Sequence, residues 1–235
     1  MVGIFVTGTD TGVGKTFITA NLLQALRAKG LKVVGMKPVA CGCIDLNGQL
    51  RNEDALMLLN ASNQPVPYDE INLYSFMEPI SPNIAARLND QFIDLHRIRL
   101  QLDALSERFD LVVVEGVGGW LTPLSDKSTV ADLAKTLALP VLLVIGLKLG
   151  CLNHAFLTTS RIALSGSPLL GWVANQIDPN LDRIDDTYRS LCDRISCSIA
   201  NVVPCLDGLE SEDATNWKQK VFDPLATEVL RRLNL

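Results

Sequence analysis

Residues 8–16 carry the glycines and side chains of which polyphosphate-binding loops are made: Gly8-Thr-Asp-Thr-Gly-Val-Gly-Lys-Thr16. In such a loop, successive backbone N–H groups and a helix N-terminus surround the phosphates. Lys15 could then neutralise the outer phosphates, and the Thr16 hydroxyl could coordinate a magnesium ion. Thr9 stands where the usual pattern has its first glycine, so an ordinary strand-to-helix turn is the alternative interpretation. The apolar run before the loop and the amphipathic pattern after it favour nucleotide binding.

Lys37 and Glu115 each end a segment that is typical of a buried strand, residues 32–36 with the apolar run 33–36 and residues 111–114, respectively. Ligands of open α/β sheets bind at the carboxyl ends of the strands, so both side chains should face the crevice beside the phosphate loop. An acid in the place of Glu115 has the form of a Walker B residue, which lies beside the magnesium shell. A solvated lysine at a strand end is the alternative for Lys37.

Asp54 and a group of glycines add weaker signals. Asp54 falls in the first turn of a helix that is expected after Asn52. A carboxylate there already suits the helix dipole, so the residues alone favour a solvated side chain over a metal ligand. Gly116, Gly118 and Gly119 let the backbone come close to a ligand, or else form a plain glycine turn.

Two later positions could complete a nucleotide and substrate site. Gly150 precedes a helix expected over residues 151–164, and a helix N-terminus can bind an anion, although most helix starts hold none. Asn175 ends a strand expected over residues 169–175 and is followed by Gln176. The Asn175 amide could hydrogen-bond a purine base, or it could satisfy the backbone of a loop.

Strand and helix patterns alternate along the chain and must position these residues. We expect strands over residues 4–6, 32–37, 72–76, 110–115, 140–145, 169–175 and 199–203. We expect helices over residues 15–29, 52–60, 94–108, 129–137, 151–164 and 222–233, a further helix from Ser81-Pro82, and a loop over residues 38–50. This alternation predicts one α/β domain over residues 1–235, with a mostly parallel sheet and helices on both faces.

Composition excludes several classes of partner. The formal charge is -5, from 21 basic against 26 acidic residues, and no basic stripe is present, so neither nucleic acid nor an anionic membrane is expected as a partner. The start of the chain has no basic leader, and no apolar run is long enough to cross a bilayer, which predicts a soluble cytoplasmic protein. Six cysteines without metal-ligand spacing predict reduced, mostly structural thiols.

With these residues laid out, the chain resembles the dethiobiotin synthetases over most of its length. The matching segments are Gly8–Thr16, Lys37-Pro-Val39, Leu50-Arg-Asn-Glu-Asp-Ala55, Glu115-Gly-Val-Gly-Gly119, Lys148-Leu-Gly-Cys-Leu-Asn-His154 and Gly171-Trp-Val-Ala-Asn175. The resemblance implies a P-loop fold and a homodimeric, magnesium-dependent ligase that uses ATP. Such a ligase closes the ureido ring of dethiobiotin from 7,8-diaminononanoate and CO2, a step of biotin synthesis.

The resemblance also assigns residues. It implies a nucleotide site made of Gly12, Val13, Gly14, Lys15, Thr16, Phe17, Asp54, Glu115, Gly116, Val117, Gly118, Asn175, Gln176, Pro204, Cys205 and Leu206. It implies a substrate site made of Thr11, Lys37 and Cys41, with Gly150, Cys151, Leu152 and Asn153 contributed by the partner subunit. Thr16, Asp54 and Glu115 would hold magnesium, and Lys15 and Lys37 would be the catalytic cations.

The chain departs from the family at some positions, and two other functions stay open. Cys41 replaces the usual Ser or Thr, and Asn175-Gln-Ile-Asp178 resembles a guanine-reading motif, which leaves ATP or GTP open. A partitioning or regulatory ATPase would carry a second loop lysine, where this chain has Asp10. The synthetase part of a cobyrinate-type amidotransferase would need a glutaminase domain, for which 235 residues leave no room.

Overall fold

A computed structural model describes residues 3–63, 65–196, 202–205 and 213–235. Its centre is a parallel sheet in the order β2-β7-β1-β8-β9. These strands are β1 (Gly3–Gly8), β2 (Val33–Met36), β7 (Leu111–Gly119), β8 (Val141–Leu147) and β9 (Leu169–Gln176). Nearly all of their residues are buried, because both faces of the sheet are covered. This explains why the strands are continuous apolar runs rather than alternating ones.

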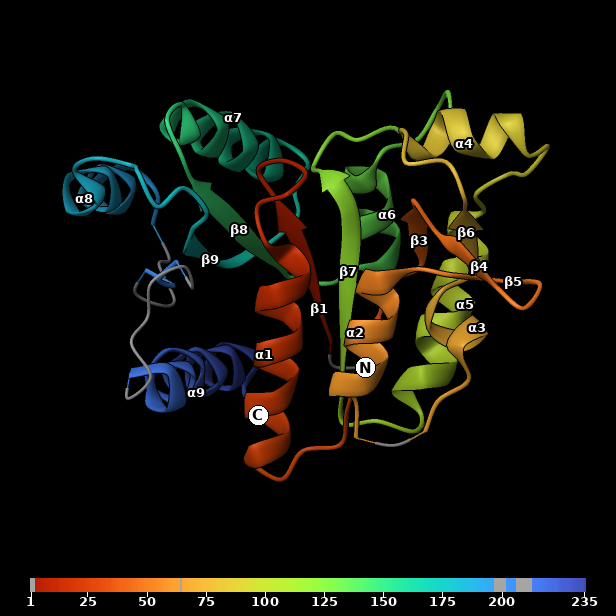
Figure 1. Ribbon diagram of the computed structural model, residues 1–235, viewed down its shortest axis with the longest axis horizontal. Coiled ribbons are helices and arrows are strands. Elements are labelled where there is room, and N and C mark those ends of the chain that lie inside the picture. Colours follow the sequence, from red (N-terminus) through yellow and green to blue (C-terminus); the bar gives the residue numbers. More distant parts are fainter. Residues whose placement is uncertain (1–2, 64, 197–201, 206–212) are drawn as a thin grey trace.

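Helices cover both faces of this sheet (Figure 1). The described helices are α1 (Lys15–Ala28), α2 (Glu53–Ala61), α3 (Tyr68–Ile71), α4 (Pro82–Leu88), α5 (Leu95–Ser106), α6 (Val130–Leu137), α7 (Cys151–Leu164), α8 (Ile184–Arg194) and α9 (Asp213–Leu233). One hydrophobic core joins the sheet to α1, α2 and α9, and the other joins it to α4 through α8. Successive residues of each strand alternate between the two cores. The predicted α/β fold with helices on both faces is therefore confirmed.

The pairing of β7 with its two neighbours brings the polar residues together. Val6 of β1 lies opposite Glu115, and Met36 of β2 lies opposite Val114. Lys37, the next residue after Met36, is therefore level with Glu115 on the adjacent strand. Gly8 pairs with Gly119, so the phosphate loop leaves the sheet beside the glycines of β7.

The prediction of a loop over residues 38–50 was wrong. β3 (Val39–Cys41) pairs in parallel with β6 (Tyr74–Phe76), and β4 (Ile44–Leu46) forms a hairpin with β5 (Gln49–Arg51). These three-residue strands are too short for a hydrophobic period to show in the sequence. The Asn47-Gly48 pair was the available signal, because both residues have positive φ, as a tight hairpin turn requires.

Other boundaries also differ from the prediction. β7 continues to Gly119 instead of ending at residue 115, because Gly119 still pairs with Gly8 of β1. α3 and α8 were not predicted, and α9 begins at Asp213 rather than at residue 222. The strand expected over residues 199–203 falls largely outside the described residues, although Val203 pairs with Asn175.

Within the described residues, no helix combines the length and the apolar character that crossing a membrane requires. The five cysteines that the structure describes are free thiols, as expected. The organisation of residues 1–235 as one domain stays a prediction.

Candidate active site

The phosphate loop has the geometry that its glycines predict. α1 starts at Lys15, and Gly14 before it has a φ of 87°. A side-chain carbon at Gly14 would lie 2.2 Å from Nδ2 of Asn175, which donates a hydrogen bond of 3.0 Å to the carbonyl of Val13. Glycine is therefore required at position 14 for two reasons: the positive φ angle is strained for other residues, and a side chain would collide with Asn175. Asn175 satisfies the backbone of the loop, which was one of its two predicted roles.

Lys15 lies folded over its own loop. Its Nζ donates to the backbone carbonyl of Asp10 at 2.9 Å. Burial and the charge of Lys37 lower the pKa of Lys15 to about 8, although nearby carboxylates act in the opposite direction. The side chain is thus a cation that the protein alone stabilises poorly, and an incoming phosphate would stabilise it.

Lys37 and Glu115 form a buried ion pair at the ends of β2 and β7. Lys37 is 3% exposed and Glu115 is 0% exposed, so neither charge is stabilised by water. Lys37 Nζ lies 2.5 Å from Glu115 Oε1 and 3.1 Å from Asp54 Oδ2, and it donates to the carbonyl of Gly116 at 3.2 Å. Burial alone would lower the pKa of Lys37, but the charges of Glu115 and Asp54 raise it overall. The ammonium therefore stays charged.

The oxygen atoms around this ion pair fit a magnesium ion. Thr16 Oγ1 donates to Glu115 Oε1 at 2.8 Å, and the other carboxylate oxygen of Glu115 is buried without a hydrogen-bond partner. Asp54 faces the cavity with 44% of its side chain exposed. No larger cluster of metal-binding side chains occurs among the described residues. Magnesium suits such a sparse set, because it keeps waters and substrate phosphates as its remaining ligands.

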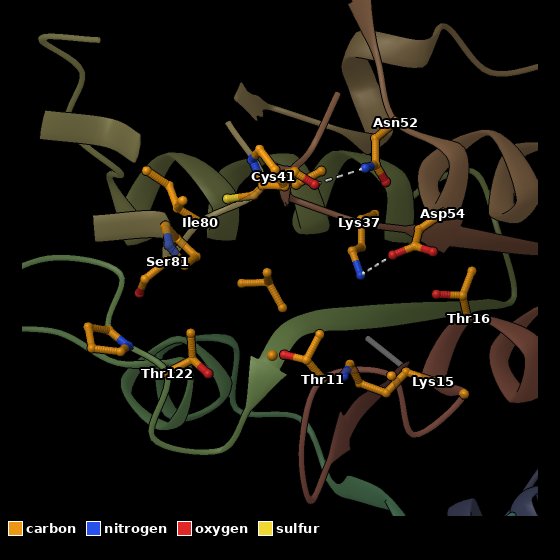
Figure 2. A pocket seen from close by; sticks show the side chains of 18 residues that line it. Thr11, Lys15, Thr16, Lys37, Cys41, Asn52, Asp54, Ile80, Ser81 and Thr122 are labelled. Atoms are coloured by element: carbon orange, nitrogen blue, oxygen red, sulfur yellow. Dashed lines mark hydrogen bonds and ion pairs between the residues drawn. The ribbon is translucent and has the colours of Figure 1, made fainter. Parts of the chain in front are cut away.

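These residues surround a cavity of about 700 Å³ (Figure 2). Figure 2 shows Lys15 and Thr16 on one side of it and Cys41, Ile80 and Ser81 on another, with the Lys37 ammonium between them. The lining residues that the sequence predicted are Thr11, Gly12, Gly14, Lys15, Thr16, Lys37, Cys41, Asp54, Val117 and Gly118. Glu115 and Gly116 do not line the cavity but contact Lys37, which does, and Val13 stands between the lining residues Gly12 and Gly14. The structure thus brings most of the predicted site together.

The remaining predicted site residues that the structure describes do not line this cavity, although Asn175 contacts the phosphate loop and Phe17 follows Thr16 on α1. Asn175, Gln176, Pro204 and Cys205 are neighbours, because Gln176 Oε1 accepts from the backbone of Cys205 at 3.3 Å. Phe17 stacks on Trp217 at 6.0 Å between ring centroids. The segment Gly150–Asn153 begins α7 and does not line the cavity of its own chain. Leu206 lies outside the described residues.

The sequence did not identify several residues that line the cavity, namely Ala40, Asn52, Pro79, Ile80, Ser81, Pro82, Thr122 and Pro123. Thr122 could have been suspected, since it stands shortly after the glycines. Its Oγ1 accepts from the backbone of Gly119 at 2.8 Å, and a side-chain carbon on Gly118 would lie 2.4 Å from it. Gly118, with a φ of 62°, is therefore required by the turn.

We expect the affinity for ATP to fall as the pH rises above about 8, where free Lys15 loses its proton. Bound phosphates require the protonated form, so affinity is complete below this pKa and falls by up to about tenfold per pH unit above it. Calorimetric titration with ATP across this range measures the change. The Lys15→Arg variant keeps its charge and should give a flat profile. An equally flat wild-type profile would contradict the assignment.

Comparison with known proteins identifies the family. A family described as an AAA domain matches residues 2–213. The chain is 45% identical over 206 residues to the ATP-dependent dethiobiotin synthetase BioD of Aromatoleum aromaticum, which covers 88% of this chain and 92% of the relative. It is 42% identical over 212 residues to the enzyme of the same name from Cellvibrio japonicus, covering 90% of this chain and 92% of the relative.

Solved structures resemble the fold at lower identity. The septum site-determining protein MinD of Pyrococcus horikoshii, complexed with Mg-ADP, superposes with a TM-score of 0.57 at 18% identity, covering 97% of this chain and 95% of that one. The Chlorobium tepidum ParA family ATPase gives 0.52 at 15% identity, covering 99% of both chains. At these identities the likeness concerns the P-loop fold alone. The sequence relatives are far closer, and the chain belongs to the ATP-dependent dethiobiotin synthetase family.

Proposed function

We propose that this chain closes the ureido ring of dethiobiotin from 7,8-diaminononanoate, CO2 and ATP, with ADP and phosphate as the other products. The observation that carries the proposal is the charged Lys37, buried between Glu115 and Asp54 at the wall of the cavity that also contains Lys15. A phosphate loop alone would suit any nucleotide hydrolase. A second, buried cation facing the same cavity suits an acidic substrate that reacts with the nucleotide.

In the proposed reaction, one amine of the substrate takes up CO2 as a carbamate, which lies near the Lys37 ammonium. A carbamate oxygen attacks the γ-phosphorus, and the bond from that phosphorus to ADP breaks. The second amine then attacks the carbamoyl carbon of the mixed anhydride and releases phosphate, which closes the five-membered ring. Each step joins groups that are already bound, so alignment supplies much of the acceleration.

The residues of this chain position the reactants and neutralise their charge. The backbone around Gly12 and Gly14 would bind the phosphates, and Lys15 would leave the Asp10 carbonyl to contact the outer ones. Thr16, Asp54 and Glu115 would hold magnesium, which supplies charge neutralisation to the phosphates when bound. Lys37 would stabilise negative charge on the carbamate as it is transferred.

A partitioning ATPase is the second candidate, because MinD and ParA proteins share the fold. Such enzymes act through a partner and need no second small-molecule site. One experiment separates the two: the purified chain is incubated with diaminononanoate, bicarbonate, magnesium and ATP, and dethiobiotin is sought by mass spectrometry. Stoichiometric dethiobiotin and ADP support the synthetase. ATP hydrolysis without dethiobiotin would overturn it.

We further propose a cytoplasmic homodimer in which the segment Gly150–Asn153 of one subunit completes the site of the other. Supporting this, the segment does not line the cavity of its own chain, and Leu149 beside it is 91% exposed. A helix N-terminus there would suit a substrate carboxylate. We expect sedimentation to show a dimer and specific activity to fall on dilution below its dissociation constant. Full activity of the monomer would contradict the proposal.

The Cys41→Ser substitution should lower the KM for the diamine by at most about tenfold, since a neutral hydrogen bond contributes about 0.5–1.5 kcal/mol. Cys41 lines the cavity, and burial raises the pKa of its thiol to about 11, so it stays protonated and is a poor hydrogen-bond partner. Steady-state kinetics measure the change, and Cys192→Ser on α8 is the control. An unchanged KM would show that the side chain of Cys41 makes no hydrogen bond that contributes to binding of the diamine.

A further inference from the structure

A chain of buried polar side chains lies behind the catalytic cavity. Asn72, which is 3% exposed, donates from Nδ2 to the backbone carbonyl of Lys37 at 2.6 Å. Its Oδ1 accepts from the hydroxyl of Tyr68 at 2.7 Å and from that of Ser75 at 2.5 Å. Buried side-chain amides usually form hydrogen bonds. The bond that Asn72 donates is notable for its partner, because it holds the backbone of Lys37, whose ammonium lies at the wall of the cavity.

The Tyr68 hydroxyl continues this chain to the start of α2. It accepts from the backbone N–H of Asn52 at 2.8 Å, while its own proton goes to Asn72. Asn52 is the N-cap of α2: its Oδ1 accepts from the N–H of Ala55, and its Nδ2 donates to the carbonyl of Cys41 at 3.3 Å. The latter bond is visible in Figure 2. One hydroxyl therefore joins the backbone of Lys37 to the cap of a neighbouring helix.

The first turn of α2 returns to Lys37 and closes a ring. Asp54 stands two residues after the cap, and its carboxylate lies 3.1 Å from the Lys37 ammonium. The ring runs from the Lys37 ammonium through Asp54, Asn52, Tyr68 and Asn72 to the Lys37 carbonyl. The ring holds the backbone at Lys37 and the backbone at the start of α2 in place relative to each other. A shift of either segment would change the distance from Asp54 to Lys37.

We infer that Tyr68 and Asn72 are positioning residues for the reaction: they set the place of Asp54, a candidate magnesium ligand, against Lys37. This inference rests on the proposed function. Neither residue touches the reactants, so both act through the two that do. Partners that orient a metal ligand typically contribute a factor of about 10 to 100 in metal affinity or activity.

The fold provides a matched control. Tyr74 is also buried, and its hydroxyl accepts at 3.0 Å from the backbone N–H of Asp94, the N-cap of α5. An arginine lies over each ring, Arg51 over Tyr68 and Arg97 over Tyr74. α5 packs on α6 and β7 and contributes nothing to the cavity. Tyr74→Phe therefore removes a bond from a tyrosine hydroxyl to a helix cap, as Tyr68→Phe does, but leaves the bond from Tyr68 to Asn72 and the site intact.

The test compares Tyr68→Phe with Tyr74→Phe in the full chain. We expect both variants to lose thermal stability, and Tyr68→Phe to lose more, because it breaks two buried hydrogen bonds and Tyr74→Phe breaks one. Only Tyr68→Phe should lower kcat, by about 10- to 100-fold, with the KM for ATP changed less than about twofold. Only Tyr68→Phe should raise, by about tenfold or more, the Mg²⁺ concentration that half-saturates fluorescence-detected ATP binding. Asn72→Ala, which breaks all the bonds of the amide, should lower kcat at least as much if it folds.

The outcomes separate this inference from the proposed function. Equal kcat and equal Mg²⁺ dependence in the two tyrosine variants would overturn the inference while wild-type synthesis of dethiobiotin still stood. A raised Mg²⁺ requirement in Tyr68→Phe alone would support the positioning role even if the wild-type protein made no dethiobiotin, in which case only the proposed function would fail.

Discussion

Replacing Lys37 with methionine is expected to lower the turnover number for ring closure by about two to three orders of magnitude, the usual effect of one lost electrostatic contact at a reacting centre. The substitution keeps most of the aliphatic stem and removes only the cation. That cation lies 2.5 Å from Glu115 and 3.1 Å from Asp54, on the wall of the cavity. Because the side chain is buried, solvent would compensate little for the loss of this positive charge.

Dethiobiotin formation at saturating ATP and diamine measures this effect. Lys135→Met is the matched control, because Lys135 is an exposed lysine in the last turn of α6, away from the cavity. ATP binding to the Lys37→Met variant should persist, since the phosphate loop is intact. Turnover of Lys37→Met at the rate of the control would remove Lys37 from the mechanism.

The Glu115→Gln substitution should affect both stability and activity. It leaves the buried Lys37 ammonium with Asp54 as its remaining anion, and breaking a buried pair in this way costs about 3 kcal/mol or more. The loss of stability is measured by urea denaturation of the protein without ligands. Activity should fall as well, because a neutral amide is a poor magnesium ligand in place of a carboxylate.

The double variant Lys37→Met/Glu115→Gln separates the two effects. It buries neither charge, so its stability should return most of the way to that of the wild type, while its activity should stay as low as that of Lys37→Met. Such non-additivity is expected of residues in direct contact. Losses of stability that simply add in the double variant would show that the buried pair does not act as a unit.

The sequence by itself determined the phosphate loop and the sheet around it. Residues 8–16 specify a loop whose glycines the structure needs, and the apolar runs before Lys37 and Glu115 specify two buried strands. Because parallel strands end at the same edge of a sheet, the placement of Lys37 and Glu115 at one crevice followed from local pattern and this general rule. Their direct contact follows from the pairing of β2 with β7, which the sequence did not predict. The loop and the individual strands depend on residues that are close together in the chain, and they could be predicted for that reason.

Tertiary structure decided where Asp54 and the residues behind it lie relative to Lys37. Nothing local distinguishes Asp54 from any acid at a helix start, and the residues by themselves favoured a solvated side chain. It meets Lys37 because Asn52 caps α2 while bonded to Tyr68, and because Asn72 bonds to the backbone of Lys37. β3 and β6 are likewise paired across more than thirty residues of sequence, between Val39 and Tyr74. Such contacts follow from the packing of segments far apart in the chain, and three-residue strands and single hydrogen bonds leave no period in the sequence.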